Sequence, residues 1–236
     1  MVFLVMCFVL SLWCRLVKMR KNMLRSFFIF GVLLFNIFGI NGDESNLNTF
    51  DINLLPADDE QCISEINKLL ANRNVSEDDR IVLKYRLNAL LKNRKGEKAT
   101  DFLFVKKDGS HGSLYDVKSD YVLVFFNNPD CETCKSIKRE IMASDYLNGM
   151  LDMGRVKLLS VCVEGEIDEW KKQQLPELWI DACDKTMSIL DDELYYLPGL
   201  PTLYLLDSNH SVLLKNTNVI NIEKCLKTRE KDCLER

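Results

Sequence analysis

The sequence Val122-Leu-Val-Phe-Phe-Asn-Asn-Pro-Asp-Cys131-Glu-Thr-Cys134-Lys-Ser-Ile decides what this chain can be. An apolar run of strand length, 121–126, meets a short polar turn, and the turn delivers Cys131 to the expected start of a helix. Positions three apart share one face of a helix, so the sulfur atoms of Cys131 and Cys134 can meet and bond. The free N–H groups and the dipole of the helix N-terminus favour the thiolate of Cys131. This pattern is how a dithiol redox site is built.

The chain has nine cysteines in 236 residues, so a Cys-x-x-Cys spacing by itself is weak evidence. A second apolar segment, Leu200-Pro201-Thr202-Leu-Tyr-Leu-Leu-Asp207, follows well downstream. Together the two motifs resemble the thioredoxin superfamily, and more closely its exported, TlpA-like branch of thiol–disulfide reductases. The resemblance covers about 98–226. With the order of strands and helices, it implies an α/β, thioredoxin-like three-layer fold with a mixed central sheet, an N-terminal β-hairpin and an inserted helical segment.

The N-terminal region has the charge pattern of an export signal. Residues 1–42 carry five basic side chains and no acidic one, and the apolar run 26–40 has the length of a signal-peptide core. We expect 1–42 to be a leader, cleaved or kept as a membrane anchor through 26–40, with a start at Met19 or Met23 as an alternative to Met1. The rest of the chain would then act in the periplasm or another extracytoplasmic space.

The remainder of the chain is acidic, with 26 basic against 35 acidic residues and a net charge of −9. This balance argues against nucleic acid as a partner. A polar linker is expected at 43–55, a helical hairpin at 56–95, and the thioredoxin-like domain at 98–236. Two apolar stripes at helical spacing predict the hairpin, and packing against the redox domain is its expected role, with a separate binding function as the alternative.

Within 98–236 the pattern predicts most elements in order. Residues 99–110 predict a strand and a turn, with Asp108-Gly109 as a hairpin signal. The remaining expectations are a helix at 135–151, a buried strand at 157–163, a short helix at 166–174, a connection of mixed pattern at 175–198, a β-hairpin at 202–215 and a closing helix at 219–228.

The resemblance implies a role for each matched residue. Cys131 would be the nucleophile and Cys134 the residue that resolves the mixed disulfide. Pro201 matches the cis-proline that faces the cysteine pair in this family, and it would aim the Leu200 backbone, beside Thr202, at a protein substrate. A membrane electron donor is an implied partner, and no cofactor is expected.

The sequence departs from cytosolic thioredoxins around the cysteines. Asp130 precedes Cys131, and Glu132 lies between the cysteines, so two acids oppose the thiolate while the helix end favours it. Lys135 partly offsets them. Cytosolic thioredoxins carry a buried acid six residues before the nucleophile, and this chain has Phe125 there. The proton relay that uses this acid is therefore in doubt for this chain. A less stable thiolate predicts a more reducing couple.

The other cysteines show no recognisable pairing. Cys162 lies in an apolar run and is expected as a small core residue. Cys62, Cys183, Cys225 and Cys233 have no evident partner, and no second pair of Cys or His has the spacing of zinc ligands, so no metal site is expected.

Two other functions compete with a reductase. In one, the Cys131–Cys134 pair is a structural disulfide in a non-enzymatic binding module. In the other, the protein is a peroxidase. This hypothesis is weaker, because the peroxidase relatives carry Thr three residues before their reactive cysteine and this chain has Asn128 there.

Overall fold

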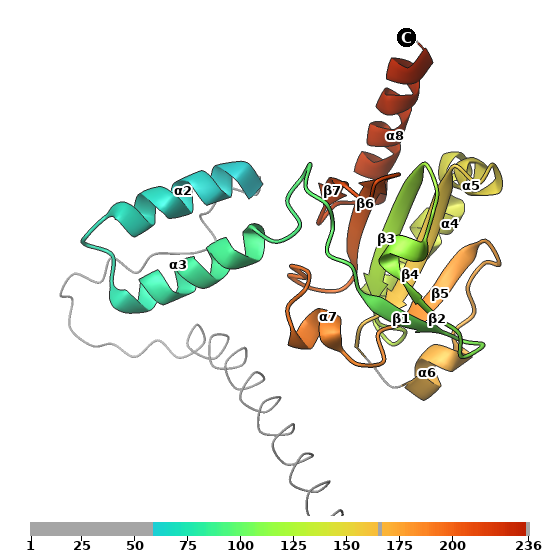
Figure 1. Cartoon of the computed structure of the whole chain (residues 1–236), viewed down its shortest axis with the longest axis horizontal. Coiled ribbons are helices and arrows are strands. Elements are labelled where there is room, and N and C mark those ends of the chain that lie inside the picture. The colour runs from blue at the N-terminus through green and yellow to red at the C-terminus, as the bar shows by residue number, and fades with distance from the viewer. Residues whose placement is uncertain (1–58, 165–166, 235–236) are drawn as a thin grey trace, which may run out of the picture. The chain divides into compact units, whose positions relative to one another are not determined.

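The computed structural model describes residues 59–164 and 167–234 (Figure 1). The predicted leader, the anchor segment 26–40 and the linker 43–55 lie outside these residues and stay predictions. The first two described elements are the predicted pair of helices, α2 (Asp59–Ala71) and α3 (Glu77–Leu90). Ser76 is the N-cap of α3, because its side chain accepts a hydrogen bond from the Asp79 amide at 3.1 Å.

A seven-stranded mixed sheet forms the centre of the rest, in the order β2-β1-β5-β4-β3-β6-β7. Its three middle strands, β5, β4 and β3, run parallel, and the strands on both sides of them pair antiparallel. The strands are β1 (Leu103–Lys106), β2 (His111–Ser113), β3 (Tyr121–Asn127), β4 (Val156–Cys162), β5 (Trp179–Cys183), β6 (Thr202–Asp207) and β7 (Val212–Lys215).

Helices cover both faces of this sheet. They are η2 (Leu114–Asp116), α4 (Glu132–Ala143), α5 (Asp145–Asp152), α6 (Ile167–Lys172), α7 (Ser188–Asp191) and α8 (Val219–Leu234). Apolar side chains of α4, α5 and α8 pack with Leu123 and Phe125 on one face, whereas η2 and α7 pack with Val124 and Phe126 on the other. Alternate residues of β3 therefore feed two cores, which confirms the predicted three-layer α/β fold.

Two segments differ from the sequence-based expectation. The predicted helix at 135–151 is two helices, because the Ser144 hydroxyl accepts a hydrogen bond from the Leu147 amide and caps a new helix there. The connection at 175–198 contains β5 and α7, and β5 pairs with β4 near the middle of the sheet. Its sequence, Trp-Ile-Asp-Ala-Cys, is too short and too interrupted by Asp181 to show a strand pattern.

The end of α3 is tied to the sheet domain by buried polar contacts. The Lys215 ammonium, whose side chain is 6% exposed, pairs with Asp59 at 2.8 Å and donates to the Leu90 carbonyl at 2.7 Å. The Asn93 side-chain amide donates to the Leu194 carbonyl and accepts from the Thr100 amide. These contacts join the end of the helical hairpin to the sheet domain, and the role of the hairpin stays a prediction.

Candidate functional site

The candidate site begins where β3 ends and α4 starts. Asn127 closes β3 with a buried side chain that donates to the Phe125 and Val161 carbonyls and the Ser160 hydroxyl. The turn follows at once: the Asn128 side chain accepts from the Asp130 amide at 2.8 Å, and its carbonyl accepts from the Cys131 amide at 3.1 Å. This tight turn delivers Cys131 to the N-cap of α4.

The two thiols differ sharply in their surroundings. The Cys131 sulfur is half-buried, accepts a hydrogen bond from the Cys134 amide at 3.2 Å and lies 3.0 Å from the Thr133 hydroxyl. Burial opposes its ionisation, but the hydrogen bonds with Cys134 and Thr133 outweigh it, so the pKa of Cys131 is lowered. Burial and the hydrogen bond to Cys131 raise the pKa of Cys134 to about 12. Cys131 is therefore the thiol poised to ionise.

The loop before β6 faces Cys131 from the other side. The Leu200–Pro201 peptide bond is cis, and the Leu200 carbonyl oxygen lies 3.7 Å from the Cys131 sulfur and 3.5 Å from the Thr133 hydroxyl. Thr202 opens β6, pairs with Phe126 of β3, and donates its hydroxyl to the Gly199 carbonyl at 2.6 Å. The sheet thus brings together residues that are about seventy positions apart in the sequence.

The charged residues around the cysteines lie on the surface. Asp130 is exposed, and the Glu132 carboxylate pairs with Lys135 at 2.7 Å. The hydrogen bond and charge of Lys135 lower the pKa of Glu132. The pKa of Lys135 is raised, first by its hydrogen bond with Glu132 and further by the charges of Asp130 and Cys131. Lys135 therefore pairs with the acid that lies between the two cysteines, and its effect on the thiolate stays a prediction.

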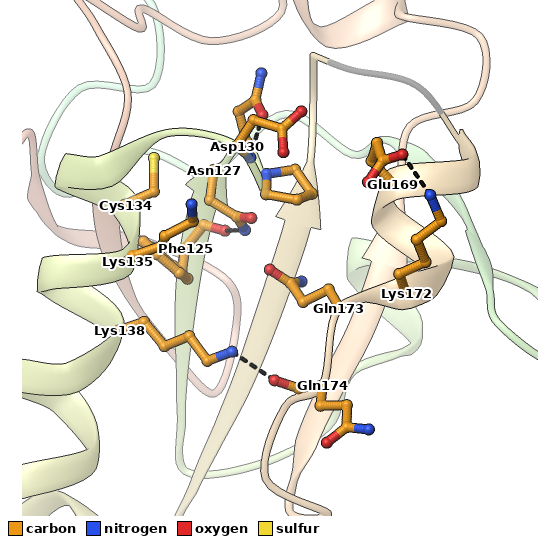
Figure 2. A pocket seen from close by; sticks show the side chains of 12 residues that line it. Phe125, Asn127, Asp130, Cys134, Lys135, Lys138, Glu169, Lys172, Gln173 and Gln174 are labelled. Atoms are coloured by element: carbon orange, nitrogen blue, oxygen red, sulfur yellow. Dashed lines mark hydrogen bonds and ion pairs between the residues drawn. The ribbon is translucent and has the colours of Figure 1, made fainter.

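A cavity of about 340 Å³ lies beside Cys134, between α4 and α6 (Figure 2). Phe125 is one of the residues that line it, and it stands where the resemblance would put a buried acid. The Lys138 side chain extends along it from α4, donates to the Gln174 carbonyl, and has a pKa lowered by burial. The sequence does not single out Lys138, because the cavity that it lines is formed only where α6 packs beside α4. The i, i+4 spacing from Cys134 to Lys138 is the one signal that could have revealed it.

A second hollow, of about 310 Å³, lies on the Cys131 side of the site. Asn128, Glu164 and Leu200 line it together with Leu190, Leu197 and Gly199. Thus Cys131 opens on one hollow while Cys134 borders the other. The lining near Leu200 is mostly apolar.

Within residues 59–164 and 167–234, no three or more metal-ligating side chains gather in one place. None of the helices in this part of the chain is long and apolar enough to span a membrane.

Comparison with known proteins gives structural relatives only, since neither a family model nor a curated protein matches the sequence. A crystal structure of a thioredoxin-like protein from Bacteroides caccae superposes with a TM-score of 0.70 at 32% identity, covering 72% of this chain and 62% of that protein. The fold of this chain is thioredoxin-like. The cis bond before Pro201, opposite the cysteine pair, lies where the resemblance places it.

Two further relatives of this thioredoxin-like chain come from Bacteroides fragilis. The C-terminal domain of an uncharacterized protein is 38% identical with a TM-score of 0.55, and 56% of this chain covers 96% of it. A conserved protein of unknown function is 29% identical with a TM-score of 0.54, and 56% of this chain covers 98% of it. The chain spans 62% of the length of the Bacteroides caccae protein. An activity for this chain is therefore proposed from its own site.

Proposed function

We propose that the protein is a thiol–disulfide oxidoreductase that reduces disulfides of protein substrates outside the cytoplasm, in the manner of the TlpA-like branch. Thiol–disulfide exchange is supported by the pairing of Cys131, whose pKa is lowered, with a buried Cys134, whose pKa is raised, opposite the Leu200 carbonyl. The reducing direction rests on the resemblance to the TlpA-like branch, because a stabilised thiolate on its own favours a more oxidising couple. A purely structural disulfide needs no such difference in acidity between its two sulfurs.

The reaction follows from this difference. The Cys131 thiolate attacks one sulfur of a substrate disulfide, forming a mixed disulfide and releasing the other substrate sulfur as a thiolate. Cys134 then gives up its proton and attacks the Cys131 sulfur. The second substrate sulfur leaves, the Cys131–Cys134 disulfide forms, and the substrate gains two electrons and two protons. A dithiol donor, proposed to be held in the membrane, returns the site to its reduced form.

The backbone around the cis bond would hold the substrate. The Leu200 carbonyl faces Cys131, so an extended peptide can pair with it as an added strand while a side chain enters the hollow beside Leu197. Thr202 supports this loop through its hydrogen bond with the Gly199 carbonyl. Leu200, Pro201 and Thr202 are therefore proposed as the substrate-binding residues, and Asp130, Glu132 and Lys135 as residues that tune the thiolate.

The test is reduction of insulin disulfides, with dithiothreitol as donor, by the full chain and by matched Cys131→Ser and Cys134→Ser variants. We expect both variants to be inactive and only Cys134→Ser to accumulate mixed disulfides through Cys131. A wild-type chain that is folded yet no faster than dithiothreitol alone would support the binding module instead. Equal trapping by both variants would contradict the roles given to the two cysteines.

A further inference from the structure

A second pair of cysteines lies in the same domain and takes no part in the proposed reaction. Cys162 is the last residue of β4 and Cys183 the last residue of β5, and the two are direct partners in the parallel register of these strands. Their side chains are 2% and 3% exposed and pack with Trp170 of α6. They are 21 positions apart in a segment whose strand β5 the sequence does not reveal.

The register gives the two residues a geometry that permits a bond. Neighbouring strands lie about 4.8 Å apart, within the range of about 4.4–6.8 Å between the Cα atoms of disulfide-bonded residues. Register partners point to the same face of a sheet, so both sulfurs project towards α6. The Cys162 thiol donates a hydrogen bond to the Glu164 carbonyl at 3.0 Å.

The two neighbouring thiols differ in acidity. The interaction with Cys183, followed by burial, raises the pKa of Cys162. The interaction with Cys162 lowers the pKa of Cys183, although burial and the charges of Asp184 and Asp181 oppose the shift. Cys183 is thus the more acidic member, with its partner directly beside it.

We propose that Cys162 and Cys183 form a second redox couple, a buried dithiol that closes to a disulfide between β4 and β5. A small organic disulfide is the oxidant. The Cys183 thiolate attacks one of its sulfurs, making a mixed disulfide and releasing one thiolate. Cys162 loses its proton and attacks the Cys183 sulfur, which releases the second thiolate. Two protein thiols are oxidised, one small disulfide becomes two thiols, and the electrons balance.

Burial sets the rate of this second couple. Both sulfurs lie beneath Trp170, so an oxidant reaches them only during local opening of the structure. Oxidation is therefore slower than at Cys131, whose sulfur is half-buried at a helix end.

The cross-link would act close to the first site. Cys162 is the register partner of Asn127, whose carbonyl accepts a hydrogen bond from the Val163 amide at 3.2 Å. Asn127 leads directly into the turn that carries Cys131. A disulfide between Cys162 and Cys183 would therefore link the end of β4, which pairs with the end of β3 below that turn, to the end of β5. The link would lie on the side of β3 that faces away from β6.

The experiment uses the full chain carrying Cys131→Ser and Cys134→Ser, which removes the first couple, incubated in native buffer with excess hydroxyethyl disulfide. Remaining thiols are alkylated after denaturation, and the digest is searched by mass spectrometry for a peptide pair joined through Cys162 and Cys183. We expect this pair as the main cross-linked product, with quenched fluorescence of Trp170 that dithiothreitol restores.

Matched variants assign the signals. Adding Cys183→Ala or, separately, Cys162→Ala should abolish both the cross-link and the quenching, whereas adding Cys225→Ala should change neither, and Trp170→Phe should remove only the fluorescence response. Recovery of Cys162 and Cys183 as alkylated thiols, as separate adducts of the reagent, or joined to other cysteines would overturn the proposal. The result does not depend on the insulin assay, because the first couple is absent from this chain.

Discussion

The domain has two pairs of neighbouring cysteines, Cys131 with Cys134 and Cys162 with Cys183, and the surroundings of the two pairs are opposite. Cys131 begins a helix, is half-buried, and receives hydrogen bonds from the following residues, while Cys134 is buried one turn later. Cys162 and Cys183 end two parallel strands, are both buried, and face each other beneath Trp170. Each cysteine of the first pair borders a hollow, whereas neither Cys162 nor Cys183 lines either of these two hollows.

This difference shows which feature of structure makes a cysteine reactive towards a protein. A helix N-terminus supplies unpaired N–H groups and partial positive charge at a chain position that is exposed. Strand ends inside a sheet supply a close partner but no route for a large substrate. The first pair is therefore suited to exchange with proteins, and the second only to small oxidants.

Replacing the attacking sulfur should have the largest effect. In Cys131→Ser the insulin reduction rate should fall by more than about a thousandfold, the scale seen when a covalent nucleophile is removed. Cys162→Ala is the matched control, and it should keep most of the activity because its sulfur does not contact the substrate hollow. A similar loss of insulin reduction rate in Cys131→Ser and Cys162→Ala would contradict the functional difference proposed for the two pairs.

Removing the cover of the second pair should cost stability rather than activity. Trp170 is 1% exposed, and its indole N–H donates to the Asp181 carboxylate at 2.7 Å. Trp170→Ala should lower the free energy of unfolding by about 3–5 kcal/mol, and Trp170→Phe by less, as measured by urea denaturation. A loss below about 1 kcal/mol in Trp170→Ala would mean that this cover is loosely packed.

The acidity of the first pair should respond to Thr133. Its hydroxyl lies 3.0 Å from the Cys131 sulfur, and a hydrogen bond to the thiolate stabilises the deprotonated form. Thr133→Val removes that bond, so the pKa of Cys131 rises and less thiolate is present at a given pH. The midpoint of the alkylation rate against pH should move upward by about one unit, since a hydrogen bond to a charged group is worth about 1.5–3 kcal/mol and part of it is regained from water. Thr133→Ser should keep the wild-type midpoint; an unchanged midpoint in Thr133→Val would remove Thr133 from the site.

Lys135 should have the smallest effect. Its charge interacts with that of Cys131, so Lys135→Met should raise the pKa of Cys131 in the same direction as Thr133→Val. Because the ammonium is exposed and already paired with Glu132, the shift should be only a few tenths of a pH unit and should vanish in high salt. The same alkylation profile at low and high ionic strength measures it. A shift as large as that of Thr133→Val would show that charge, rather than hydrogen bonding, controls the thiolate.

The sequence by itself determined the first pair and the general fold. An apolar run of strand length, a polar turn and a Cys-x-x-Cys at a helix start are all local, and local geometry follows from side-chain chemistry and spacing. The β-hairpin at Asp108-Gly109 was predictable for the same reason, since Gly109 adopts a φ of 83° in a tight turn. The placement of Pro201 came from the resemblance, and the structure shows the cis bond there.

Tertiary structure alone decided the rest. Cys162 and Cys183 meet only because β5 pairs in register with β4. The five residues of β5, which include Asp181, do not reveal that register in the sequence. The approach of Lys138 to the cavity beside Cys134 depends on α6 packing alongside α4. The physical reason is the same in both cases. A contact between distant residues is set by the mutual fit of whole elements in the core, and no short stretch of sequence contains that information.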